Sequence, residues 1–409
     1  MAVSNFVCAD SLKQGLINQS TPDDETVVNG VTTLNTAKTL PTASFGLALL
    51  AKEVAAKPGE NVVLSPLSIS VALGMTANGA RGNTFNGIAS ALRIGSELAD
   101  NNHGYAALLA MLKRENLGVT LDVANAIFAR LGVGFNEAFL LANQNFFNAR
   151  VDQLDFDDPA TIGVINSFVS DSTNKKIDTL LKDPIAAETV MFLVNCVYFK
   201  GEWTVKFDKS LTKDLPFHAL GGAVNLPIMY RNDKMAHGQD HVNGAWESIT
   251  LPFGESEAVR NVTILPAPGK TIEDVLGTLD EATLKWVAAS SWKSEGQLWL
   301  PRMDLAYENS LNNSLKALGM TDAFDGSADF GGMRPVPPVL FIKDVKHKAV
   351  FTVDEEGAEG AAVTSVEMGL ESLPPPPFAM RVDRPFLNFV VDSASNAVLF
   401  ASAVHKPLK

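Results

Sequence analysis

The chain has 409 residues, 46% of them hydrophobic and 19% charged, with 30 Gly, 21 Pro and two Cys. This composition excludes a disordered or collagen-like protein and provides enough apolar surface for a large core, although length alone leaves the number of domains open. Because 33 Lys and Arg stand against 46 Asp and Glu, the net charge of −13 disfavours binding to nucleic acid or to an anionic membrane.

Residues 1–40 are rich in Asn, Ser, Thr and Asp and show no persistent helical or strand period, so we expect a mobile N-terminal extension. The first residues lack the basic region and long apolar stretch of a signal peptide. Either the chain stays inside the cell or a signal has been removed. We favour a secreted or periplasmic protein, with the cytoplasm as the alternative.

The folded body is predicted to begin with a helix at Thr42 that ends before Pro58, because apolar residues recur on one of its sides. That side is formed by Phe45, Leu49, Leu50 and Val54. The next segment, residues 61–84, predicts a short strand followed by a helix. Ser65 is expected to be the N-cap of this helix and Pro66 its first residue.

Further helices are predicted at residues 105–115, 136–147 and 161–170, with an alternating strand at 119–123. The run from residue 189 to 199 is nearly all apolar or β-branched, which is typical of a strand covered on both faces at the centre of a sheet. Six strand-like runs follow at 246–253, 260–267, 296–304, 346–354, 386–393 and 397–404. Since no repeat or linker separates the halves, we predict one mixed α and β domain over residues 41–409.

Residues 357–377 should form a 21-residue loop between two strands, and loops of this length are uncommon. Read with a period of two, one face of the segment is small or apolar throughout: Ala358, Gly360, Ala362, Thr364, Val366, Met368 and Leu370. The other face carries all the charge. This is the pattern of a half-buried strand. The segment is therefore either an ordinary strand of the resting fold, which is the commoner case, or an exposed loop that becomes a strand in a second state.

Five motifs, taken in order, resemble the serpin family. They lie at residues 61–84, 194–203, 300–324, 345–364 and 378–407. Their order and spacing match the family from about residue 41 to residue 407. The resemblance implies an α+β serpin fold of about nine helices around three β-sheets, with a reactive-centre loop at about 357–377.

The resemblance also implies a function. Serpins are not enzymes: they inhibit serine proteases, and in some cases cysteine proteases, by acting as suicide substrates. The protease cleaves the reactive-centre loop and is trapped as an acyl-enzyme while the loop inserts into the central sheet. We expect such a protease as the partner of this chain. We expect no cofactor, metal ion, nucleic acid or membrane partner, and a monomeric protein.

The resemblance assigns the loop's hinge to a continuous run: Glu355, Glu356, Gly357, Ala358, Glu359, Gly360, Ala361, Ala362 and Val363. The small residues on its buried face are typical of inhibitory members of the family. Gly360 stands where Ala is usual, and a glycine within a strand costs roughly 0.5–1 kcal/mol relative to Ala. We expect insertion to remain favourable.

Counting along the hinge as the family does places the scissile bond between Glu371 and Ser372. A glutamate at this point implies a glutamyl-specific protease, because a buried carboxylate needs a charged partner. Cleavage at Leu370–Glu371 or Met368–Gly369 would instead imply an elastase-like or chymotrypsin-like target.

Other matched residues have structural roles in the family. Ser65, Ser68, Asn195 and His347 match a polar cluster beneath the opening sheet. Trp203 matches the aromatic residue where the loop enters the sheet, a role compatible with plain core packing. The sequence Arg384, Pro385 and Phe386 matches the motif that anchors the far end of the loop. Lys175 departs from the family, since many serpins have Gly there.

The sequence can be compared with two alternatives to a protease inhibitor. The first alternative is an enzyme. The sequence does not support it, because the chain has neither a G-x-S-x-G nor an H-E-x-x-H motif. His237 and His241 are expected in a polar turn and not in a zinc site, and Cys196 is expected to be an inert core residue. The second alternative is a non-inhibitory serpin acting as a carrier, storage or chaperone-like protein. Charged or bulky hinge residues would favour it, and positions 358–362 lack them on the small-residue face.

Overall fold

A computed structural model describes residues 27–28, 31–32, 40–115, 117–182, 184–335, 339–358 and 377–408. The chain divides into two units, Met1–Lys38 and Thr39–Lys409. In the first, β1 (Val27–Val28) pairs antiparallel with β2 (Val31–Thr32). All other elements belong to the second unit. None of the helices described is long and apolar enough to cross a membrane.

Nine α-helices lie in the described part of the second unit: α1 (Thr42–Ala56), α2 (Pro66–Ala77), α3 (Gly82–Leu92), α4 (Leu98–Leu112), α5 (Glu137–Phe147), α6 (Ala160–Ser172), α7 (Ile272–Leu276), α8 (Glu281–Ala289) and α9 (Asn312–Ala317). The predictions for α1, α2, α5 and α6 are confirmed, including the cap: the Ser65 side chain accepts a hydrogen bond from the Ser68 amide. Helix α4 begins seven residues earlier than predicted. Helix α3 was not predicted, because its Gly, Asn and Ser residues favour turns in isolation.

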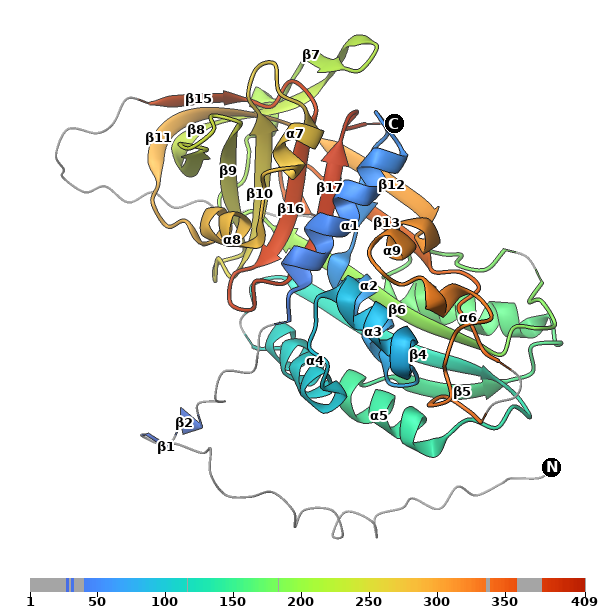
Figure 1. Cartoon of the computed structure of the whole chain (residues 1–409). Coiled ribbons are helices and arrows are strands. Elements are labelled where there is room, and N and C mark those ends of the chain that lie inside the picture. The colour runs from blue at the N-terminus through green and yellow to red at the C-terminus, as the bar shows by residue number, and fades with distance from the viewer. Residues whose placement is uncertain are drawn as a thin grey trace. The chain divides into compact units, whose positions relative to one another are not determined.

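The largest sheet has nine strands in the order β15-β11-β8-β9-β10-β16-β17-β3, with β7 also paired to β8 (Figure 1). Its strands are β3 (Val62–Leu64), β7 (Lys213–Ala219), β8 (Gly222–Gln239), β9 (Trp246–Phe253), β10 (Val259–Pro266), β11 (Ser294–Pro301), β15 (Phe378–Arg381), β16 (Phe386–Asp392) and β17 (Val398–Val404). Strands β9, β10, β16 and β17 confirm the predicted runs, whereas β7 and β8 were not predicted. The predicted strand at 296–304 is wrong in extent, since β11 ends at Pro301 and a separate strand follows.

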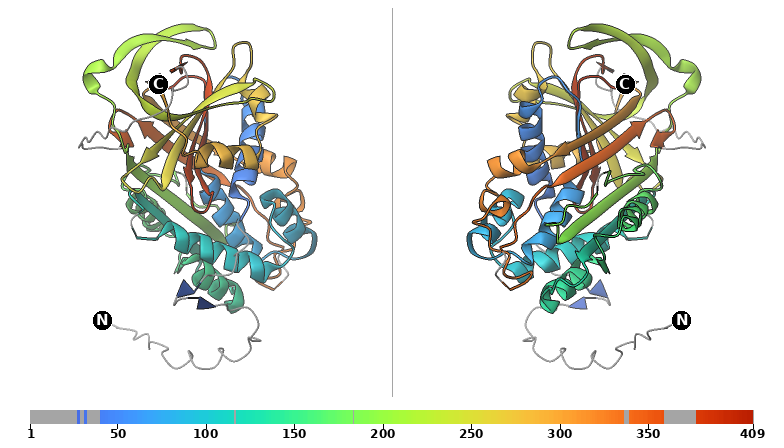
Figure 2. Two further views of the ribbon diagram at one scale, coloured as in Figure 1. Left: turned by 90° about the vertical axis from the view of Figure 1, so that its left-hand side faces the viewer. Right: turned by 90° about the vertical axis from the view of Figure 1, so that its right-hand side faces the viewer.

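Two smaller sheets complete the unit. One has the order β14-β6-β4-β5, and the other contains β12 and β13. Their strands are β4 (Thr120–Arg130), β5 (Arg150–Leu154), β6 (Met191–Glu202), β12 (Met303–Ser310), β13 (Lys346–Val353) and β14 (Gly357–Ala358). Figure 2 shows the orange pair β12–β13 beside the green strand β6. With nine helices and three sheets in its described part, the second unit matches the predicted α+β architecture.

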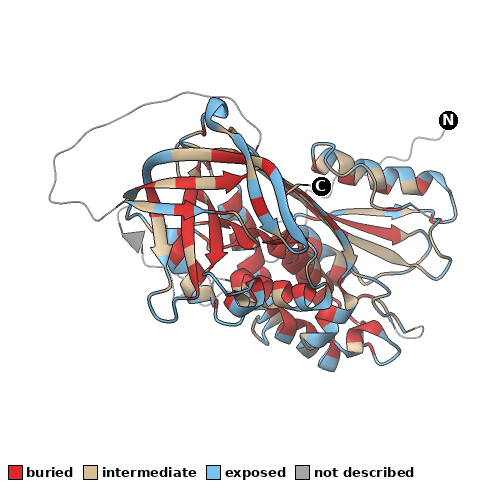
Figure 3. Ribbon diagram, turned by 90° about the horizontal axis from the view of Figure 1, so that it is seen from above, coloured by how far each residue is buried: buried red, intermediate tan, exposed pale blue. Residues whose placement is uncertain are grey.

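Apolar side chains gather in two clusters. The main core packs the inner face of the nine-stranded sheet against α1 and α2, and Figure 3 shows the buried residues concentrated there. A second cluster lies under α6 and joins this helix to β4 and β6. Strand β6 therefore has one face toward each cluster, which explains its nearly continuous apolar sequence.

Candidate functional site: a slot in the central sheet

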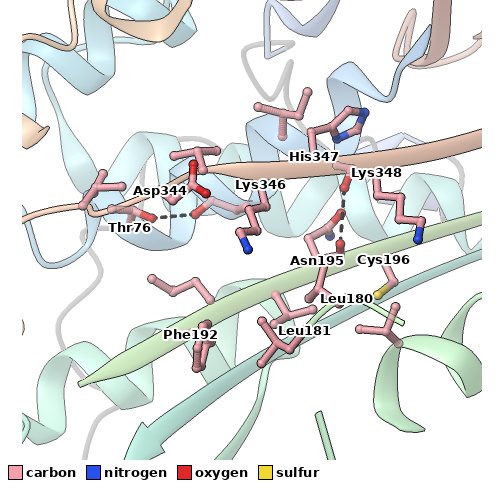
Figure 4. A pocket seen from close by; sticks show the side chains of 18 of the residues that line it. Thr76, Leu180, Leu181, Phe192, Asn195, Cys196, Asp344, Lys346, His347 and Lys348 are labelled. Carbon is pink, nitrogen blue, oxygen red and sulfur yellow. Dashed lines mark hydrogen bonds between the residues drawn. The ribbon is translucent and has the colours of Figure 1, made fainter. Parts of the chain in front are cut away.

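A cavity of about 850 Å³ separates β6 from β13. Residues 191–199 of β6 line one side of it and residues 346–352 of β13 line the other (Figure 4). Strand β6 was predicted to be central in a sheet, and this is correct only at its end. Among the described residues, β4 pairs with residues 191–200 and β14 pairs only with Gly201 and Glu202, while the edge of residues 191–200 that faces the cavity has no strand partner. We call this cavity the slot.

The chain that leaves β13 turns back into the sheet beside β6. Asp354 and Gly357 form an antiparallel bridge, and β14 then pairs antiparallel with β6, with Gly357 opposite Glu202 and Ala358 opposite Gly201. Gly357 has φ of +125°, and a Cβ added to it would lie 2.4 Å from the Gly201 carbonyl oxygen. Only glycine fits this turn. The hinge thus begins as a strand at one end of the slot.

Glu355 fixes this turn to the body of the protein. Its side chain is 2% exposed and accepts hydrogen bonds from Arg302, at 2.9 Å from Nε and 2.7 Å from Nη2. The Thr212 hydroxyl donates a further bond to the same carboxylate. Burial alone would raise the pKa of the Glu355 carboxyl, but the bonds from Arg302 and Thr212 outweigh it and lower this pKa. Glu355 is therefore held as a carboxylate.

Trp203 and two lysines hold the same turn from the side of β6. The Trp203 indole donates to the Asp354 carbonyl at 2.8 Å, and its ring stacks on Phe253 with centroids 4.5 Å apart. Glu356 forms ion pairs with Lys206 at 3.0 Å and Lys209 at 2.8 Å. Trp203 is buried, so it both packs in the core and contacts the hinge.

The four predicted cluster residues lie together along the slot. Nε2 of His347 accepts a hydrogen bond from the Ser65 amide at 3.3 Å, and the Ser68 hydroxyl donates to the Asn195 carbonyl at 3.4 Å. The Asn195 amide donates to Asn125 Oδ1 at 2.5 Å. Among the described groups, the buried Asn195 Oδ1 atom has no hydrogen-bond partner. The cluster therefore crosses from α2 to both strands that border the slot, with one acceptor unsatisfied.

His347 should make the stability of the protein depend on pH. Burial lowers the pKa of His347 from 6.5 to about 4. Between these pH values the unfolded chain binds a proton at His347 that the folded protein excludes. The contribution of His347 to the free energy of unfolding is therefore fully present above pH 6.5, and up to about 3 kcal/mol of it is lost as the pH drops toward 4. Urea unfolding at pH 7.5 and pH 4.5 should show this loss in the parent protein and a smaller loss in His347→Gln. Equal losses in the two proteins would contradict the assignment.

The segment after α6 spans the slot. The Lys348 ammonium on β13 donates to the Thr179 carbonyl at 3.1 Å, and Glu308 on β12 pairs with Lys182 at 3.4 Å. Farther along, Lys343 pairs with Glu188 at 2.6 Å. These polar contacts join the α6 side of the slot to the β12–β13 side, so a strand that filled the slot would have to pass beneath them.

Several predicted residues have no described geometry. Residues 359–376 lie outside the described part of the chain, and with them the hinge from Glu359 to Val363 and the predicted bond Glu371–Ser372. The alternative bonds Leu370–Glu371 and Met368–Gly369 lie there too. The far anchor is described: Nη2 of Arg384 donates to the Pro266 carbonyl at 2.8 Å.

The structure corrects one expectation and explains another. His237 does not lie in a turn but within β8, where its ring stacks on Phe378 at 4.3 Å, because the bare backbone of Gly296 leaves room for the Phe378 ring. Within the described residues no group of three metal-ligating side chains occurs.

Lys175 has φ of +60°, the left-handed conformation that favours the Gly usual in serpins.

The expectation for Cys196 is confirmed, since its side chain is buried and burial raises the pKa of the thiol to about 12. Sequence reasoning missed the partners of the hinge acids, namely Arg302, Thr212, Lys206 and Lys209. They lie 53 to 150 residues before the hinge and on separate elements, so no local pattern connects them with it. In the sequence, only the adjacent glutamates Glu355 and Glu356 indicate that cationic partners lie near the hinge.

Comparison with known proteins agrees with this geometry. Residues 41–407 match the family described as serpin (serine protease inhibitor). Iripin-8 of Ixodes ricinus is 31% identical over 376 residues, 88% of this chain and 91% of that protein. Serpin B9 of Homo sapiens is 32% identical over 383 residues, which are 90% of this chain and the whole of that protein.

Solved structures give the same result. The native state of tengpin, a thermophilic serpin, superimposes with a TM-score of 0.80 and 26% identity, over 95% of this chain and 97% of that one. Thyroxine-binding globulin in complex with thyroxine gives a TM-score of 0.78 and 25% identity, over 91% and 99% of the two chains.

Proposed function

This chain belongs to the serpin family, and from that premise we propose that it inhibits serine proteases by inserting its cleaved reactive-centre loop into the slot between β6 and β13. The observation that carries the proposal is the junction of slot and hinge: β14 already pairs with β6 where the slot begins. The protein itself is not an enzyme, and its partner is a protease.

The register of β14 supports the proposal. Continuing the pairing one residue at a time would bring Gly360 opposite Phe199 and Thr364 opposite Asn195. Directly opposite residues of an antiparallel pair share a face. The odd-numbered residues of β6 from Leu193 to Phe199 include those that pack against the main core. The small and apolar face of the loop would therefore meet the core, and Thr364 would bring a hydroxyl to the unsatisfied Asn195 Oδ1.

The same register accounts for the charged face. Glu359 would lie opposite Lys200, so the first loop carboxylate would meet an ammonium group across the strands. Such opposite-charge pairs are worth roughly 0.2–1 kcal/mol. A shift of one residue would instead put Glu359 on the face of the main core. The sequence pattern and the observed pairing therefore agree on one register.

The unusual Gly360 also has a physical explanation within the proposal. Continuing the hairpin from the Asp354–Gly357 bridge would bring position 360 opposite Phe351 on β13, with Phe199 on its other side. Phe199 and Phe351 both contact Phe400, with ring centroids 6.5 and 5.4 Å away. A residue without a side chain leaves space between these two aromatic rings, which offsets part of the cost of glycine in a strand.

The non-inhibitory alternative rests on the similarity to thyroxine-binding globulin, whose solved structure is a complex with thyroxine. A carrier does not require a hinge that matches the slot in register. The agreement between hinge, slot and register favours inhibition over the carrier alternative.

A panel of proteases tests the proposal. The protein is mixed with a glutamyl-specific endopeptidase, an elastase and chymotrypsin, and complexes that resist SDS are separated while the cut is mapped by mass spectrometry. We expect a complex cut after Glu371 with the glutamyl enzyme, or after Leu370 or Met368 with the others. Cleavage of the loop by every enzyme without any complex would contradict inhibition.

A further inference from the structure

The outer face of the nine-stranded sheet carries a row of two partly exposed aromatic side chains and one exposed cationic side chain. Tyr230 on β8 is opposite Trp299 on β11, which is opposite Arg381 on β15. The Arg381 guanidinium lies 4.3 Å from the Trp299 ring centroid, and the Tyr230 and Trp299 rings are 5.1 Å apart. The strands are neighbours at one end of the sheet (Figure 1). We call Tyr230, Trp299 and Arg381 the docking surface.

The burial pattern shows that this row faces outward. Met380 and Leu298, which alternate with the row on their strands, are both fully buried, whereas Arg381 is exposed and Trp299 partly so. Among the described residues no carboxylate forms an ion pair with Arg381. A guanidinium stacked on a tryptophan keeps its N–H donors in the plane of the group, available to a partner.

Resting on the inhibitory function proposed above, we propose that the docking surface binds the target protease while it holds the reactive-centre loop. Ser372 to Pro377 are six residues, which can span at most about 20 Å. Beyond them Phe378 begins β15, the strand that carries Arg381. A protease domain of about 230 residues has a radius of gyration of about 17 Å, and so a diameter of about 45 Å.

The partner is therefore wider than the tether that separates the bond from β15. A protease that grips the predicted bond comes within reach of the strands that continue from the loop, whichever of the three candidate bonds it cuts. Tyr, Trp and Arg are the residues that most often dominate binding at protein interfaces. The occupant is therefore the attacking protease, and the docking surface contacts the side of the protease that holds the residues after the scissile bond.

The charge of the surface specifies the kind of protease. Arg381 can pair with a carboxylate in two parallel hydrogen bonds, which gives direction as well as attraction. The surface thus fits a protease with an acidic rim on that side of its cleft. Because the net charge of this chain is −13, a local positive group would also orient an acidic partner that the rest of the molecule repels.

The variant Arg381→Glu tests the proposal, and Lys270→Glu is the matched control. Lys270 is exposed in the turn between β10 and α7, and the control changes the net charge by the same amount. With the panel protease that forms the SDS-stable complex, we expect Arg381→Glu to slow the second-order association rate at least tenfold, and Lys270→Glu to change it less than twofold. The stoichiometry of inhibition and the melting temperature should be unchanged in both.

Three results test this proposal separately from the inhibitory function. Equal association rates for Arg381→Glu and Lys270→Glu, with normal complexes, would overturn the docking surface alone. A second variant, Tyr230→Ser, should slow association in the same direction without altering charge, and a rate equal to that of the parent would also count against the surface. Loop cleavage without a complex in the parent protein would overturn the inhibitory function instead.

Discussion

A protein that carries Ala358→Arg should be cleaved in its reactive-centre loop but should no longer inhibit. Ala358 pairs with Gly201 on β6, and a Cβ added at Gly201 would meet Phe199, Phe253 and Val119. Since opposite residues share a face, an arginine at 358 would lie in this apolar surrounding without a partner, which costs several kcal/mol and weakens the β14–β6 pairing from which insertion continues. Insertion should become slower than deacylation, so the protease is released before it is trapped.

The measurement is the stoichiometry of inhibition, the moles of this protein consumed for each mole of protease trapped. We expect it to rise at least tenfold in Ala358→Arg. The control Ala358→Ser adds one small polar atom at the same position and should stay within twofold of the parent. Unchanged inhibition by the arginine variant would refute insertion at this position.

Cleavage of the loop should raise the melting temperature by on the order of 10 °C or more. The slot of about 850 Å³ leaves the edge of β6 at residues 191–200 without a strand partner among the described residues. A new strand would satisfy this edge and the facing edge of β13, and would cover the apolar walls of the slot. Differential scanning calorimetry of intact and loop-cleaved protein measures the difference.

Ala358→Arg provides the control for this measurement as well. Cut at the same bond, the variant should melt close to its intact form, because its loop cannot enter fully. If the cleaved parent also melted with its intact form, the slot would not be the destination of the loop.

Local patterns predict much of the fold. The helix pattern and Pro66 place α1 and α2, and the alternating runs place β9, β10, β16 and β17. They succeed because burial of one face imposes a period on the residues. Strand β8 escapes prediction because its 18 residues pass from one part of the sheet to another, and the buried face changes along it. Helix α3 escapes because tertiary contacts override its weak propensity.

The candidate site likewise contains residues that sequence motifs predict and residues that they do not. The hinge and polar cluster follow from motifs that can be read in order along the chain. Arg302 and Lys206 cannot be found in that way, because their roles exist only once separate strands converge on Glu355 and Glu356. The slot itself is a missing pairing between β6 and β13, and an apolar run such as 189–199 predicts burial without specifying which neighbours supply it.

Hydrogen exchange of β6 tests the central claim most directly. Amides of residues 191–200 that point into the slot should exchange measurably faster in the intact protein than after loop cleavage, as should those of β13 at residues 346–352, because the inserted strand would bond to both edges. Mass spectrometry of peptides from these two strands reads the difference, and β9 serves as an internal reference. We predict strong protection of both strands on cleavage, with β9 unchanged. Equal exchange before and after cleavage would contradict insertion into the slot.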